Sequence, residues 1–158
     1  MADLLLTLQD TPVTDVLRQW RWAYPLVNAA HLVGIALLFG AIAPLDLRLL
    51  GLWPTLPLAP LARVLVPVAG SGLALALLTG PVLFLADPRR YGPLGLFQFK
   101  LALISLAVFH VFWVHQSRAW TTGLTGQTAL AVRLRWAGLI SLTLWFSVLL
   151  CGRLIAYV

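Results

Sequence analysis

Four polar side chains stand in apolar surroundings where they could carry out chemistry. His31 lies inside one long apolar stretch, Lys100 directly precedes another that contains His110, and Arg153 follows the last one. A polar group placed in a bilayer is costly and marks a functional site by default. A neutral imidazole is the commonest metal ligand in proteins. His31, the most deeply placed polar residue of its stretch, is therefore the first candidate.

Other catalytic patterns are missing from the sequence. It contains no Gly-rich phosphate loop, no CxxC or HExxH motif and no glutamate. Acid–base hydrolysis, which uses paired proton donors and acceptors, is therefore not expected.

Four stretches without a charged residue must position these side chains, and they cover residues 22–45, 64–86, 101–117 and 136–152. A bilayer core ~30 Å thick needs about 20 apolar residues in a helix. With their flanks, the stretches predict membrane spans at about 24–48, 61–86, 97–118 and 133–156. We therefore expect one all-α domain over residues 1–158, an integral membrane four-helix bundle. A short amphipathic helix within residues 2–20 should lie in the membrane interface.

Composition supports this class. The chain is 61% hydrophobic and 10% charged, well below the roughly 25% charged residues of soluble domains. Its 11 basic residues are spread over every loop, so nucleic acid is excluded as a partner and the lipid bilayer is expected. Cys151 is the only cysteine, which rules out an internal disulfide.

The loops give the expected orientation and packing. Four spans place both termini on one side, and the basic residues of the loops number four on that side and five on the other. This favours termini on the periplasmic side of a bacterial inner membrane. Gly70 and Gly72 predict close approach of a neighbouring helix. The prolines of residues 51–60 predict a non-helical connector. Asp46, Arg48 and His115 are expected at the interface.

Depth along the helices brings several polar residues to one level. With a rise of 1.5 Å per residue, His31 lies ~10 Å and Lys100 ~5 Å below the N-terminal face. Arg153 and the Thr79–Gly80 step approach the same level from the last and second spans. Asn28 shares the His31 face at i−3. The sequence therefore predicts a shallow polar layer to which all four helices contribute.

Each of these residues also has a structural alternative. His31 and His110 could hydrogen-bond across a helix pair, and Lys100 and Arg153 could extend to the headgroups. His110 lies ~10 Å deeper than His31. The two histidines could therefore ligate one haem only if the macrocycle were tilted.

Several strings resemble a bacterial family of small four-helix membrane proteins of unknown function. They are residues 22–34 (WAYPLVNAAHLVG), 46–51 (DLRLLG), Thr79-Gly80, 97–101 (FQFKL) and 151–157 (CGRLIAY). More distantly, the layout is similar to the membrane domain of copper-resistance D proteins and to HemJ-type protoporphyrinogen oxidases. HemJ-type proteins bind haem b and depend on a His in helix one and a Lys at the start of helix three. His31 and Lys100 match those positions, although the wider sequence departs from that of a HemJ enzyme.

The resemblance implies a b-type haem site for electron transfer or membrane redox chemistry. His31 would ligate the iron, Arg153 would pair with a propionate, and Lys100 would be a second ligand or propionate partner. Asn28 and Thr79 would complete the site, and His110 is the second candidate for the iron. Homo-oligomers or other membrane redox proteins are the expected protein partners. Two alternatives remain open: copper or proton handling along His31, His110 and Asn28, and a non-catalytic assembly subunit.

Overall fold

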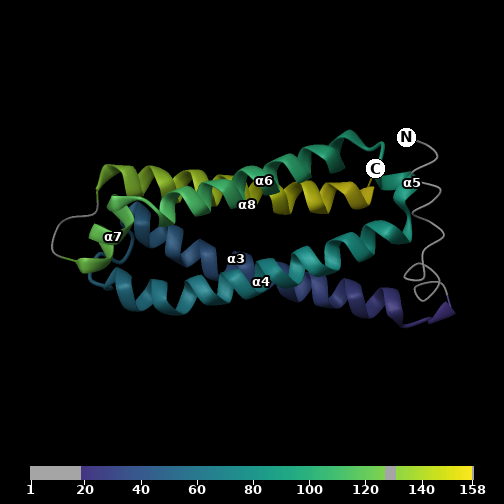
Figure 1. Ribbon diagram of the computed structural model, residues 1–158, viewed down its shortest axis with the longest axis horizontal. Helices are drawn as coiled ribbons and strands as arrows, with labels where there is room; N and C mark the ends of the chain where they lie inside the picture. Colours follow the sequence, from purple (N-terminus) through teal and green to yellow (C-terminus); the bar gives the residue numbers. More distant parts are fainter. Residues whose placement is uncertain (1–18, 127–130, 158) are drawn as a thin grey trace.

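The computed structural model describes residues 19–126 and 131–157, and within them the chain is helical without strands (Figure 1). The four long helices are α3 (Ala23–Leu50), α4 (Leu58–Ala86), α6 (Gly95–His115) and α8 (Val132–Leu154). Two short helices, α5 (Pro88–Tyr91) and α7 (Arg118–Thr125), lie in the connections, and the turn η1 (Ile155–Tyr157) extends α8. All four long helices are apolar and long enough to cross a membrane. The expected all-α membrane bundle is confirmed.

Local capping explains where the helices end. Gly51 adopts a left-handed conformation (φ 109°) and donates its N–H to the carbonyls of Arg48 and Leu47, which closes α3. The Ser117 hydroxyl accepts the N–H of Trp120 and thereby starts α7. The third span stops at His115, earlier than the predicted residue 118.

The connector after α3 is shorter than predicted. Helix α4 already begins at Leu58, so Pro60 lies in its first turn. A proline is tolerated there because the first N–H groups of a helix have no intrahelical partner. The amphipathic helix predicted within residues 2–20 falls almost wholly outside the described residues.

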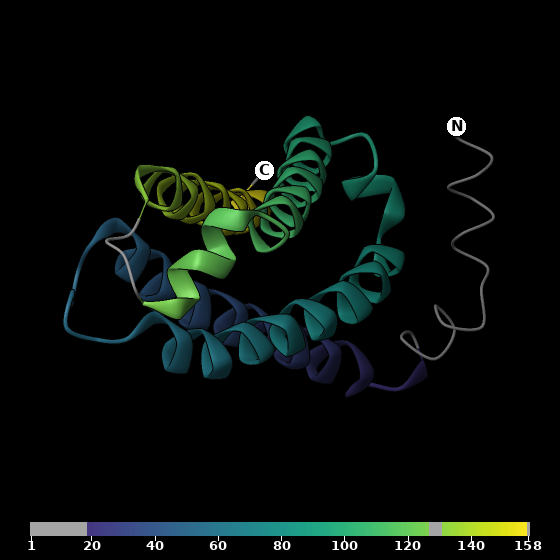
Figure 2. The same cartoon turned by 60° about the vertical axis from the view of Figure 1, so that its left-hand side comes forward.

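The long helices form two layers. Helix α3 packs on α4, α6 packs on α8, and the contact between α3 and α8 joins the pairs (Figures 1 and 2). The described chain begins and ends at the same end of the bundle, and α7 covers the opposite end (Figure 1). Several large apolar side chains of α4 and α6, among them Leu78 and Phe112, are exposed and face where lipid would be.

A glycine pair sets the crossing of α3 and α4. A Cβ added at Gly72 would lie 2.5 Å from the Leu38 amide nitrogen and 2.6 Å from the Gly34 carbonyl oxygen. Only glycine allows the two backbones to come this close. At Gly70 an added Cβ would meet nothing within 4 Å. The prediction of close approach is therefore right for Gly72 and wrong for Gly70, which lies on another face of α4.

Candidate functional site

The His31 side chain bridges α3 and α4. Its Nδ1 lies 2.9 Å from the Thr79 hydroxyl oxygen, and that hydroxyl donates its proton to the Leu75 carbonyl at 2.6 Å. A hydroxyl has one proton, so Thr79 must accept a hydrogen bond from Nδ1–H. In the neutral imidazole this leaves Nε2 with a lone pair. The network therefore fixes the tautomer in which Nε2 is free to bind a metal.

Small residues and a lysine complete the surroundings of His31. A Cβ at Gly80 would lie 3.5 Å from His31 Cε1, so the imidazole packs directly over this glycine. The half-buried Lys100 lies between α6 and α8, and its Nζ would be 3.4 Å from a Cβ at Gly152. Lys100 lies in the second turn of α6 and His31 in the third turn of α3, and both helices begin at the same end of the bundle (Figure 1). His31, Thr79 and Lys100 therefore share one region, as the sequence predicts.

Two other predicted members do not join this group. Arg153 is exposed; its guanidinium hydrogen-bonds to the Tyr157 hydroxyl and lies 4.9 Å from the centre of that ring. This arrangement is the one expected of an arginine that extends to the membrane interface. Asn28 is also exposed, one turn before the half-buried His31. The structure brings neither side chain onto His31.

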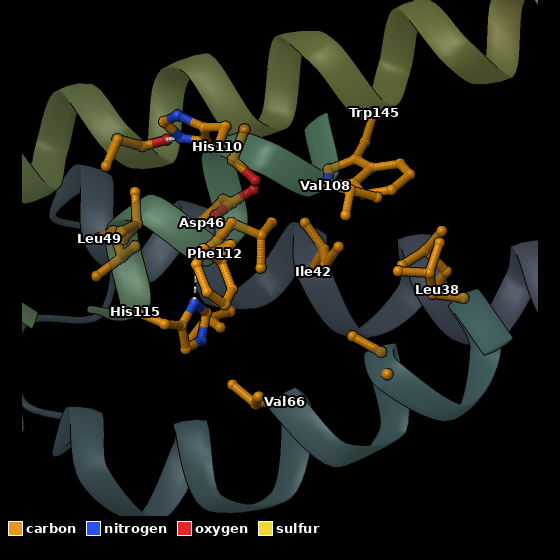
Figure 3. Close-up of a pocket in the computed structure, with 18 of the residues that line it drawn as sticks. Leu38, Ile42, Asp46, Leu49, Val66, Val108, His110, Phe112, His115 and Trp145 are labelled. Atoms are coloured by element: carbon orange, nitrogen blue, oxygen red, sulfur yellow. Dashed lines mark hydrogen bonds between the residues drawn. The ribbon is translucent and has the colours of Figure 1, made fainter. Parts of the chain in front are cut away.

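A second polar region lies about 15 residues, or ~22 Å, further along α3. Here Asp46 of α3, His110 and His115 of α6, and Trp145 of α8 line a cavity of about 330 Å³ (Figure 3). His110 Nε2 donates to the Ala137 carbonyl at 3.0 Å and so joins α6 to α8. His31 and Asn28 do not line this cavity. The path for copper or protons along His31, His110 and Asn28 stays a prediction.

Asp46, Arg48 and His115, predicted at the membrane interface, lie near the ends of α3 and α6, but they are less exposed than that prediction implied. Asp46 and Arg48 are buried, with 4% and 8% of their surface exposed. Arg48 donates to the backbone carbonyls of Leu56 and Pro54 and thereby holds the connector rather than Asp46. His115 is half-buried, with its ring 4.5 Å from that of Trp120. The α7 turn that covers this end was not predicted, so its effect on burial could not be foreseen.

Trp145 and Ser141 are cavity residues that the sequence analysis missed entirely. Both are buried on α8, and Ser141 is the polar neighbour of the Asp46 carboxyl group. Their spacing of four residues on one helical face was the available signal.

No protein-family model, curated protein or solved structure matches this chain. The class of this protein is therefore defined by its fold and its polar sites alone. It is a four-helix protein of the membrane-spanning type, with a hydrogen-bonded His31–Thr79 pair between α3 and α4 and one polar cavity.

Proposed function

We propose that this protein is a membrane redox protein that binds a b-type haem through Nε2 of His31. The observation that carries the proposal is the hydrogen-bond chain from His31 Nδ1–H through Thr79 to the Leu75 carbonyl. Histidines that ligate metals commonly donate their other ring N–H to a nearby oxygen, which fixes the ring and raises its basicity. An imidazole held in this way fits an axial position on iron, where haem supplies one-electron transfer.

Lys100 has the second role in the proposal. It is half-buried near His31 and has no carboxylate close by among the described residues. A neutral amine would serve as a second ligand, and an ammonium would pair with a propionate. Arg153 would reach a propionate only after leaving Tyr157, so we give it a lesser role than the sequence suggested.

The test is an absorption spectrum of the purified protein from haem-producing cells. We expect a Soret band, with α and β bands after reduction. His31→Ala should lose the haem because iron loses its protein ligand. Lys100→Ala should shift the bands or weaken retention. A colourless wild-type protein, or full haem occupancy in His31→Ala, would refute the assignment.

A conservative variant tests the hydrogen-bond chain itself. Thr79→Val keeps the shape of the side chain and removes the acceptor of His31 Nδ1–H. Haem should remain, and its reduction potential should rise because the imidazole becomes a weaker donor to iron. The matched control is Thr143→Val, whose exposed hydroxyl bonds only to Leu139 of its own helix. An unchanged potential in Thr79→Val would separate Thr79 from the proposed site.

The other candidate functions have less support. Within residues 19–126 and 131–157, no three His, Cys, Asp or Glu side chains gather into a metal site. His31 alone would give a copper ion only one protein ligand. In haem, four ring nitrogens already hold the iron, so one protein ligand is sufficient. A purely structural role for His31 remains the outcome if the protein is colourless.

We further propose a bacterial inner membrane location with both termini in the periplasm. Arg89→Cys, at the end holding the termini, should then react with an impermeant maleimide in intact cells. Thr55→Cys, at the opposite end, should react only after lysis. The reverse pattern would invert the orientation. In the described part of the chain the only other cysteine, Cys151, is buried.

A further inference from the structure

We propose that the cavity around Asp46 is a binding site for a lipid-soluble hydroquinone, and that it prefers this reduced form to the quinone. The cavity is separate from the His31 layer, so the proposal does not depend on haem.

The cavity is partly open, and residues of all four long helices and Trp120 of α7 line it. Its volume of about 330 Å³ is within the range of small-molecule pockets. Aliphatic and aromatic side chains such as Ile42, Val66 and Phe112 form most of its wall (Figure 3). A ligand with an apolar body is therefore expected.

Three polar atoms in this wall are left without partners. In the described part of the chain, the buried polar side-chain atoms that lack a hydrogen bond are Asp46 Oδ2, His115 Nε2 and Trp145 Nε1. All three residues line the cavity. Asp46 and Trp145 are only 4% and 3% exposed. A buried polar atom without a partner destabilises the fold, and such atoms are rare. Their convergence on one cavity therefore points to a ligand that completes them.

The chemistry of these atoms defines the ligand. The Trp145 Nε1–H only donates. His115 Nδ1 lies 2.8 Å from the Val111 carbonyl, which can only accept. Nδ1 must therefore carry the proton, and in the neutral ring Nε2 is an acceptor. The Asp46 carboxyl accepts, and it donates when protonated. The site thus offers one donor, one acceptor and one group that can do either.

A hydroquinone matches this set better than a quinone does. Each of its hydroxyl groups donates and accepts, so one can donate to His115 Nε2 while the other accepts from Trp145 Nε1–H and donates to Asp46 Oδ2. The carbonyl oxygens of a quinone only accept, which would leave His115 Nε2 unsatisfied. Sites built around a hydrogen bond discriminate strongly against analogues that cannot make it.

The route into the cavity indicates a ligand that comes from the lipid. A groove between α4 and α6 is lined by Leu77, Ile104, Ser105, Val108, Phe109 and Phe112. It shares Val108 and Phe112 with the cavity. Leu77, Phe109 and Phe112 are exposed, so they would face acyl chains in a membrane. An acyl chain could enter by this route, but it would leave the three polar atoms without partners.

Calorimetric titration of the purified protein in detergent micelles tests the proposal. The probes are a decyl-substituted p-benzohydroquinone under anaerobic conditions, the corresponding quinone, and 1-decanol. We expect saturable binding of the hydroquinone, with a rise in melting temperature by mass action. The quinone should bind at least about tenfold more weakly, which is the effect of one buried hydrogen bond. No binding of the hydroquinone, or equal binding of 1-decanol, would overturn the proposal.

Three variants locate the binding. Gly70 lines the cavity and has open space around it, so Gly70→Leu should fill the cavity and abolish binding without unfolding the protein. Trp145→Phe should weaken the hydroquinone about tenfold. Trp136→Phe is the matched control, because Trp136 is 60% exposed on the same helix. His115→Leu should remove the preference for the reduced form. Unchanged affinity in both Gly70→Leu and Trp145→Phe would place the ligand elsewhere and refute the site.

Haem content is measured separately on the same preparation. A protein without haem could still bind the hydroquinone. A protein that does not bind the hydroquinone could still hold haem through His31.

Discussion

The two polar regions of this bundle differ in whether their polar side chains have hydrogen-bond partners. Around His31 the imidazole, the Thr79 hydroxyl and the Leu75 carbonyl satisfy one another in sequence. Around Asp46, three buried atoms face a cavity with no partner. Since a buried polar group stabilises only when it is paired, the first region supports the fold, whereas the second weakens it unless a ligand is bound. Substitutions in the two regions should therefore have effects of opposite sign.

The largest effect is expected at the helix crossing between the two regions. Gly72→Leu would drive a side chain into the backbone of α3 near Leu38, where even a Cβ has no space. The contact cannot relax without separating α3 from α4, so we expect loss of folded protein. Size-exclusion chromatography and melting in detergent would show it. Gly70→Leu, two residues away, is the control and should give a wild-type yield. Normal folding of Gly72→Leu would contradict the described crossing.

In the satisfied region, removing one partner should destabilise the protein. Thr79→Val leaves His31 Nδ1–H without an acceptor, which should lower the free energy of unfolding by about 1–3 kcal/mol. Unfolding by increasing amounts of a denaturing detergent measures this in the haem-free protein. Thr143→Val should change it little, because that hydroxyl is exposed. A stabilised Thr79→Val protein would remove the contrast between the two regions.

In the unsatisfied region, removing a polar group should have the reverse effect. Asp46→Leu replaces a buried carboxyl that has an unpaired oxygen with an apolar side chain, and the cavity gives it room. We expect a gain of about 1 kcal/mol in the ligand-free protein. The same unfolding assay applies. Clear destabilisation would mean that the contact of the Asp46 carboxyl with Ser141 outweighs the cost of its unpaired oxygen.

The smallest effect is expected for Trp145→Phe. It removes an unpaired N–H, which stabilises, and it leaves a gap in the packing, which destabilises. The two contributions should nearly cancel, to within about 1 kcal/mol. A melting curve that is unchanged while hydroquinone binding weakens would separate the binding role of the indole from its packing role. A large drop in stability would assign Trp145 to packing alone.

The sequence by itself determined the helices and the depth of the polar residues. Long uncharged stretches can satisfy their backbone in a bilayer only as helices, and the rise per residue places His31, Thr79 and Lys100 at one level. The helix ends were less well predicted. Hydropathy does not show that Ser117 caps α7, or that Pro60 can be accommodated in the first turn of α4.

Only the tertiary structure decided which faces meet. Rotation of each helix about its axis turns Gly72 rather than Gly70 toward α3. The Arg153 side chain is exposed and bonds to Tyr157 of its own helical segment. Packing of α8 against α3 buries Asp46, and Trp120 of α7 packs against the half-buried ring of His115. Depth follows from counting residues along one helix, but burial and partnership depend on how helices distant in sequence pack.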